Sequence, residues 1–96
     1  MKTTDEVLVL LRQALPRLQA TYPIRSLALV GSYARGEQTP QSDVDLLIDI
    51  APTIGWDLAL VHQELETLLG LPVDLIEVGG LRPWWHDILV PGARHV

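Results

Sequence analysis

The segment GSYARGEQTPQSDVDLLI, residues 31–48, decides the fold expected of this chain. Ten residues separate its opening pair, Gly31-Ser32, from the triplet Asp43-Val44-Asp45. The residues after Asp43 are mostly branched and apolar, which is typical of a β-strand. Because side chains alternate between the two faces of a strand, Asp43 and Asp45 are expected to share one face. The opposite face would turn apolar side chains into a core, namely Val44, Leu46, Ile48 and Ile50.

The two carboxylates on one strand face point to a cation site. Their side chains would lie about 6–7 Å apart along the strand and would repel each other unless positive charge lay between them. A hard divalent cation such as Mg²⁺ fits, because it takes oxygen ligands and usually keeps a substrate phosphate among them. The alternative is that Asp43 and Asp45 are two solvated acids at the start of a strand.

Hydrophobic spacing and chain-breaking residues predict the elements on either side of this segment. Thr3 and Glu6 have the spacing of a capping box, and apolar residues at helical intervals follow them. Pro16 is expected to kink that first helix or to end its regular part. The other predicted elements are a strand over 26–30, a loop over 39–42, a helix over 56–69 capped by Gly70, a strand over 73–78 and a short helix over 84–90.

Length, charge and composition exclude several classes of protein. The 96 residues form one domain, 1–96, with room for a single core but none for a separate substrate-recognition domain. The net charge is −5 and the seven Lys and Arg residues are scattered, which argues against a long nucleic-acid ligand. The absence of cysteine fits a reducing compartment, so we expect a cytoplasmic protein. The acidic start and the short apolar runs predict neither a signal peptide nor a membrane span.

The motif formed by Gly31-Ser32, Asp43 and Asp45, with a further acid at Asp74, resembles the nucleotidyltransferases of the polymerase-beta-like superfamily. It is most similar to the short MNT-type, or minimal nucleotidyltransferase, members, whose signature is Gly-Ser, ten residues, then Asp-x-Asp. The resemblance covers residues 5 to 90. It implies an α+β fold, in which helices pack on a small mixed β-sheet. It also implies two divalent ions, expected to be Mg²⁺, held by the aspartates, with ATP as the substrate.

Three residues are candidates for binding the nucleotide. Gly31 has no Cβ, so its backbone can come close to a phosphate, and the Ser32 hydroxyl can donate to a phosphate oxygen. The alternative for this pair is an ordinary turn between a strand and a helix. Arg35 could neutralise part of a triphosphate, although a solvated loop arginine is almost as good an explanation. For Tyr33, local packing is favoured over contact with the nucleotide.

Asp74 is the candidate for the third acid. It lies in an otherwise apolar strand, where aspartate is disfavoured and where a carboxylate needs a partner. In the family that the chain resembles, this acid is a metal ligand or a general base for the acceptor hydroxyl. The alternative is a surface aspartate on an edge strand. Glu77 alternates to the other face and is the weaker candidate, while Asp49 and His62 are expected at the surface.

The pair Trp84-Trp85 is the other unusual feature of the sequence. Two adjacent tryptophans on a short helix cannot both face the same core, and an exposed one could anchor an interface. The alternative is that one is buried and the chain itself partly covers the other.

Two functions are therefore compatible with the sequence. The first is an enzyme that transfers AMP from Mg-ATP to a hydroxyl, with the resemblance implying a tyrosine of a HEPN-type toxin as acceptor and an antitoxin role. Asp43, Asp45 and Asp74 would then be the catalytic and metal-binding residues. The second is a binding module that neutralises its partner by contact alone. The sequence leaves a homo-oligomer open and does not identify the acceptor or the nucleotide base.

Overall fold

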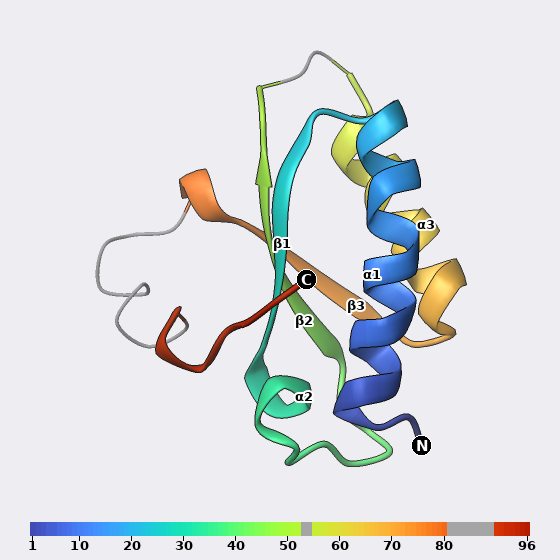
Figure 1. The fold of residues 1–96 in the computed structure, drawn as a ribbon, viewed down its shortest axis with the longest axis vertical. Coiled ribbons are helices and arrows are strands. Elements are labelled where there is room, and N and C mark those ends of the chain that lie inside the picture. Colours follow the sequence, from blue (N-terminus) through green and yellow to red (C-terminus); the bar gives the residue numbers. More distant parts are fainter. Residues whose placement is uncertain (53–54, 81–89) are drawn as a thin grey trace.

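Two helices pack on one face of a β-sheet, which gives the molecule two layers (Figure 1). The computed structural model describes residues 1–52, 55–80 and 90–96. Within these residues, four strands form one sheet in the order β3-β2-β1-β4. The strands are β1 (Ile24–Val30), β2 (Val44–Ile50), β3 (Val73–Glu77) and β4 (Arg94–His95). β1 is antiparallel to β2 and β4, while β2 and β3 are parallel, which confirms the expected α+β fold with a mixed sheet.

The helices are α1 (Thr4–Thr21), α2 (Gly31–Arg35) and α3 (Asp57–Leu69), and two 3₁₀ turns, η1 (Val78–Gly80) and η2 (Val90–Gly92), complete the elements that the structure describes. α1 and α3 cover the same face of the sheet, and α2 is a single turn at the lower end of β1 (Figure 1). None of the helices in the described ranges is long and apolar enough to cross a membrane.

Local sequence explains where α1 and α3 begin and end. The Thr3 hydroxyl accepts from the Glu6 N–H, and the Glu6 carboxylate accepts from the Thr3 N–H, so the predicted capping box is present. Pro16 does not end α1, which continues to Thr21. Gly70 caps α3 with φ +66, a conformation that glycine adopts without strain.

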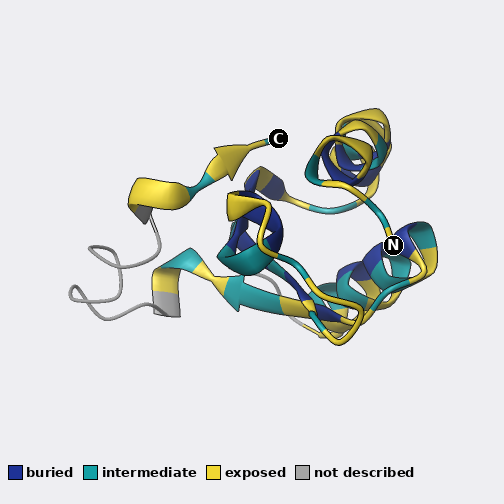
Figure 2. Ribbon diagram, turned by 90° about the horizontal axis from the view of Figure 1, so that it is seen from below, coloured by how far each residue is buried: buried dark blue, intermediate teal, exposed yellow. Residues whose placement is uncertain are grey.

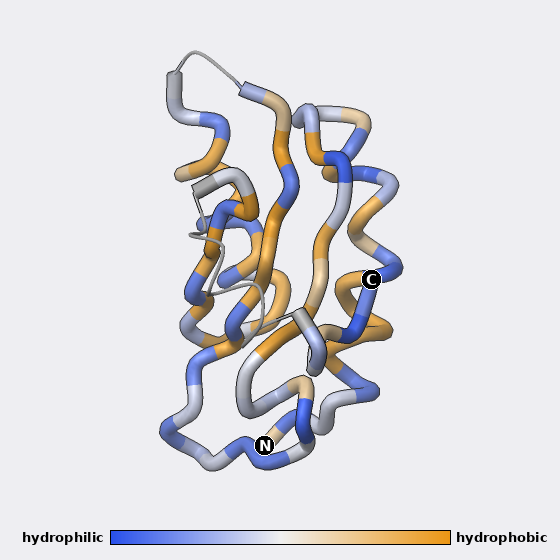
Figure 3. Tube along the Cα trace, turned by 90° about the vertical axis from the view of Figure 1, so that its left-hand side faces the viewer, coloured by the Kyte–Doolittle hydropathy of each residue, from blue (hydrophilic) through white to orange (hydrophobic). Residues whose placement is uncertain are grey.

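The alternation expected for β2 is confirmed and divides the apolar residues into two clusters. Val44, Leu46 and Ile48 are fully buried between the sheet and the two helices, where they join the main core. On the other face Leu47 packs with Ala28 and Val30 in a smaller cluster. Long stretches of β1 and β2 are accordingly hydrophobic (Figure 3), and each helix buries the side that faces the sheet (Figure 2). Asp45 shares a face with Leu47, so it lies on the side of the sheet away from α1 and α3.

Some boundaries differ from the prediction. α3 begins at Asp57 rather than at residue 56, and β3 ends at Glu77, because the chain turns into η1 there. The sequence did not predict β4, a pairing of only two residues with Ala28 and Leu29. Most of the helix predicted over 84–90, including Trp84 and Trp85, lies outside the described residues, and Val90 begins η2.

Candidate active site

The predicted site residues lie at one end of the sheet. Asp45 belongs to β2 and Asp74 to β3, Asp43 lies in the loop before β2, and α2 carries the nucleotide-binding candidates Gly31, Ser32 and Arg35. Val30, the last residue of β1, is the register partner of Asp45 in β2. On its other side Asp45 is the register partner of Asp74 in β3. Register partners on adjacent strands point to the same face and lie about 5 Å apart. The sheet therefore brings Gly31, Asp45 and Asp74 into one row, with the glycine at one end and Asp74 at the other.

Gly31 leaves the space that the Asp45 carboxylate occupies. Its φ is +72, and a Cβ built at this position would lie only 2.3 Å from Oδ2 of Asp45. Any other residue would thus meet both backbone strain and a direct clash. Ser32 follows in the first turn of α2 and is half-buried. Gly31 therefore lies directly beside the Asp45 carboxylate, although fourteen positions separate the two residues in the sequence.

The surroundings of Asp45 disfavour its ionised form. Burial raises the pKa of the Asp45 carboxyl above its ordinary value of 3.8, and the nearby carboxylates of Asp74 and Asp43 raise it further. The Arg35 guanidinium acts in the opposite direction and lowers it. Three acids thus share one electrostatic environment, which a cation would stabilise.

Asp43 is less constrained than the sequence predicted. β2 begins at Val44, so Asp43 lies in the preceding loop and is exposed. Within the part of the chain that the structure describes, no three Asp, Glu or His side chains are gathered closely enough to hold a metal ion. The predicted row of acids is present, but the side chains of Asp43, Asp45 and Asp74 do not converge on one point. The strands fix the backbone of Asp45 and of Asp74, whereas Asp43 is an exposed residue of the loop before β2.

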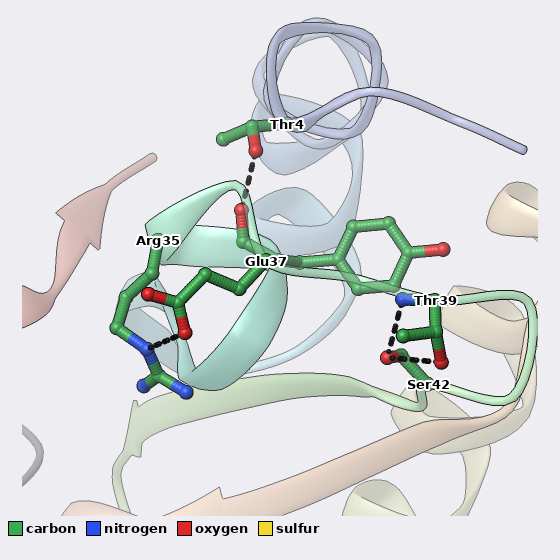
Figure 4. A network of polar contacts seen from close by, with 6 residues as sticks. Thr4, Arg35, Glu37, Thr39 and Ser42 are labelled. Carbon is green, nitrogen blue, oxygen red and sulfur yellow. Dashed lines mark hydrogen bonds and ion pairs between the residues drawn. The ribbon is translucent and has the colours of Figure 1, made fainter.

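Polar contacts hold the chain between the Gly-Ser turn and β2 (Figure 4). The Thr4 hydroxyl donates to the carbonyl of Tyr33, whose ring is only 1% exposed, so Tyr33 packs in the core as predicted. The Thr39 N–H donates to Ser42 Oγ at 2.9 Å, immediately before Asp43. These contacts attach the motif to the N-terminus of α1 and shape the loop that leads to β2.

Arg35 is exposed and forms an ion pair with Glu37, with 3.1 Å between Nε and Oε2 (Figure 4). An exposed pair of this kind contributes little to stability. Arg35 is thus an exposed arginine whose charge acts on Asp45, and both interpretations drawn from the sequence, phosphate binding and a solvated loop arginine, stay open.

A groove of about 600 Å³ opens beside Asp74, between β3 and the start of α3. Trp56, which is 80% exposed, lines it together with His62. The prediction of a surface position for His62 was only partly right, because its Nε2 lies 2.6 Å from the Val73 carbonyl oxygen and the residue is half-buried. No pattern in the sequence distinguished Trp56 or His62, since both depend on how α3 packs beside β3.

The donor set suits a hard cation better than any other. Asp43, Asp45 and Asp74 offer only carboxylate oxygens, which Mg²⁺ prefers, and the chain contains no thiolate. Burial and the neighbouring carboxylates raise the pKa of Asp45, and a cation placed among these carboxylates would offset their mutual repulsion. By the chemistry of their oxygens, Asp43, Asp45 and Asp74 suit the predicted metal. The structure does not gather the three around one point, so their assignment as ligands stays a prediction.

Asp45→Asn is expected to raise the stability of the metal-free protein at neutral pH. Because the folded-state pKa of Asp45 lies above 3.8, its ionised form disfavours folding at neutral pH, and this penalty disappears as the pH falls through the raised pKa to below 3.8. The gain in melting temperature should therefore be largest near about pH 7 and shrink towards about pH 4. Thermal unfolding in a chelating buffer across this range measures it, and a constant difference would contradict the electrostatic explanation.

The sequence is similar to a known domain family and to named proteins of that family. The model of the nucleotidyltransferase domain matches residues 11–91. A chain of Methanocaldococcus jannaschii that is provisionally named a protein adenylyltransferase is 44% identical over 80 residues, which are 79% of each chain. The protein adenylyltransferase MntA of Thermococcus cleftensis is 36% identical over 84 residues, which span 85% of this chain and 84% of the relative.

Solved structures show the same fold. A protein provisionally named a minimal nucleotidyltransferase superposes with a TM-score of 0.82 at 30% identity, over 99% of this chain and 97% of the other. A tri-AMPylated HEPN toxin of Shewanella oneidensis in complex with an MNT antitoxin provides a second match. Its TM-score is 0.57 at 20% identity, and the match spans 96% of this chain and 66% of the other. At that identity the second match supports the fold alone.

Proposed function

Because this chain belongs to the nucleotidyltransferase family, we propose that it transfers AMP from ATP to a hydroxyl group of a partner protein, a HEPN-type toxin, and so acts as an antitoxin. The relatives named protein adenylyltransferase support the reaction. The class of acceptor is proposed by analogy with the complex of an AMPylated HEPN toxin and an MNT antitoxin, whose fold this chain shares. The chain is accordingly an enzyme, with ATP as its nucleotide substrate.

The observation that carries the proposal is the row formed by Gly31, Asp45 and Asp74. Gly31 and Ser32, at the end of β1, would bind the triphosphate, with Arg35 close enough to neutralise part of its charge. Asp43 and Asp45 would hold Mg²⁺, and Asp74 would be the third acid of the metal site. When bound, Mg²⁺ supplies charge neutralisation for the attacking and leaving oxygens.

The reaction then needs little more than positioning. The acceptor hydroxyl oxygen forms a bond to the α-phosphorus of ATP, and the bond from that phosphorus to the bridging oxygen breaks. Pyrophosphate leaves with the electron pair, and the hydroxyl proton passes to a base, for which Asp74 is the candidate. Asp74 lies at the far end of the row from Gly31 and borders the groove with Trp56, so an acceptor can approach from that side.

Incubating the purified protein with a HEPN-type toxin of its own host and Mg-ATP should therefore yield a toxin whose mass is increased by one or more AMP units. Intact-mass spectrometry of the toxin measures this and gives the base and the stoichiometry together. Omitting Mg²⁺ should abolish the adduct. An unmodified toxin under all conditions would contradict the proposal.

Growth of cells that express the toxin separates catalysis from binding. The double variant Asp43→Ala, Asp45→Ala is expected to lose protection, because both acids would be needed for transfer. If the double variant still protects the cells and still binds the toxin, contact alone neutralises the partner, and the chain is a binding module.

A further inference from the structure

The first residue of β3 is held from outside the sheet by two side chains of α3. The Val73 N–H donates to Oε2 of Glu66 at 2.8 Å, and Nε2 of His62 lies 2.6 Å from the Val73 carbonyl oxygen. A carbonyl oxygen only accepts, so Nε2 of His62 is the donor. His62 and Glu66 lie one turn apart on the same side of α3, and their Nε2 and Oε2 atoms are 3.6 Å apart.

This arrangement is unusual because β3 is the outermost strand on its side of the described sheet. Backbone groups on an outer edge normally face water. Here both polar backbone groups of Val73 are taken, its side chain is only 6% exposed, and the carbonyl of Pro72 accepts from the Val44 N–H at 2.9 Å. The start of β3 is thus held by the core, by β2 and by α3 at the same time.

Asp74 is the next residue, and its own side chain is exposed. The position of its carboxylate relative to Asp45 therefore depends on the backbone that carries it. We propose that His62 and Glu66 are positioning residues, which set Asp74 in register with Asp45 for the transfer reaction by holding the backbone of Val73. This inference rests on the proposed function, in which Asp74 completes the catalytic set.

The expected effect is a fall in rate without a loss of nucleotide binding. Glu66→Ala and His62→Ala should each lower kcat for AMP transfer by about 10- to 100-fold, as is typical when a residue that supports a ligand is removed. KM for ATP should change little, because the Gly-Ser turn at the other end of the row would bind the nucleotide. Mn²⁺ affinity in the absence of nucleotide should fall by about 10-fold.

Conservative variants distinguish positioning from general stability. Glu66→Gln keeps an oxygen that accepts from the Val73 N–H, and His62→Gln keeps a donor for its carbonyl, so both should retain most of kcat. Glu64→Ala is the matched control: Glu64 lies on the same helix and is similarly exposed, but its partner is Arg17 of α1, at 3.1 Å. Because this pair is exposed, Glu64→Ala should change stability little, and it should leave kcat and Mn²⁺ affinity unchanged.

The outcomes separate the two proposals. If Glu66→Ala matches Glu64→Ala in kcat and in Mn²⁺ affinity, the contacts to Val73 are only structural and the inference is wrong. If Glu66→Ala does not fold, Glu66→Met keeps the length of the stem and serves the same comparison. If the wild type transfers no AMP but binds Mn²⁺, the proposed function fails while the metal titration still decides the role of His62 and Glu66. A wild type that neither transfers AMP nor binds Mn²⁺ would overturn both.

Discussion

Asp45→Asn should reduce kcat for AMP transfer by about 100- to 1,000-fold, the largest effect that we expect from any single change. Asparagine has the same shape but lacks the charge that would hold a cation between Asp45 and Asp74. Because Asp45 also touches Gly31, it would connect the metal to the triphosphate, so no neighbouring acid can take its place. Steady-state kinetics with labelled ATP and the toxin as acceptor measure the loss.

Asp49→Asn is the control for this experiment. Asp49 lies on the same strand and, by alternation, on the same face, but at the other end, where it pairs with Arg25 at 3.3 Å. Its replacement should leave kcat unchanged. Equal losses in the two variants would show that the rate depends on the general negative charge of this face and not on Asp45. The loss in activity should accompany the gain in stability expected at neutral pH, because the Asp45 charge that disfavours folding of the metal-free protein is the charge that would bind the cation.

Gly31→Ala should disable the protein through two effects that can be separated. The first is backbone strain at φ +72, which costs about 1–3 kcal/mol in the free energy of unfolding. The second is the clash of the new Cβ with the Asp45 carboxylate, 2.3 Å away, which must push that side chain out of the row. We expect AMP transfer to fall by about 100-fold or more, because a displacement of this size misaligns the reacting groups. Chemical denaturation and transfer kinetics measure the two effects.

Gly36 provides the matched control, because its φ is +70 but a Cβ there would meet nothing within 4 Å. Gly36→Ala should therefore show the loss of stability and leave most of the activity. Adding Asp45→Ala to Gly31→Ala removes the carboxylate that the Cβ meets. This double variant should recover part of the stability and none of the activity. Equal activity in Gly31→Ala and Gly36→Ala would contradict a specific role for the Gly31–Asp45 contact.

Structural features that depend on residues close together in the sequence were predicted correctly. The capping box at Thr3, the αL cap at Gly70 and the alternation along β2 each depend on residues within a few positions of one another. The turn between β1 and α2 at Gly31-Ser32, which the sequence analysis gave as the alternative to a phosphate-binding pair, is local in the same way. Pro16 shows the limit of such rules, because α1 continues to Thr21 through packing against the sheet.

Features that depend on contacts between distant segments were not predicted. β4 pairs over only two residues, too few to leave a pattern, and the place of His62 depends on α3 packing beside β3. The exposure of Trp56 beside Asp74 belongs to the same class. For Asp43 a prediction was made and was wrong: the motif indicated a strand position, whereas β2 begins one residue later, at Val44.

The sequence by itself determined the type of chemistry available to this protein: a Gly-Ser pair, an Asp-x-Asp motif at the start of a strand and a later acid, at spacings that local rules translate into elements. Only the tertiary structure decided that Asp74 stands beside Asp45, that Gly31 makes room for the Asp45 carboxylate, and that α3 holds the start of β3. The physical reason is that strand register and helix packing arise from the burial of whole faces of the sheet. No local pattern specifies which distant residue will lie opposite another.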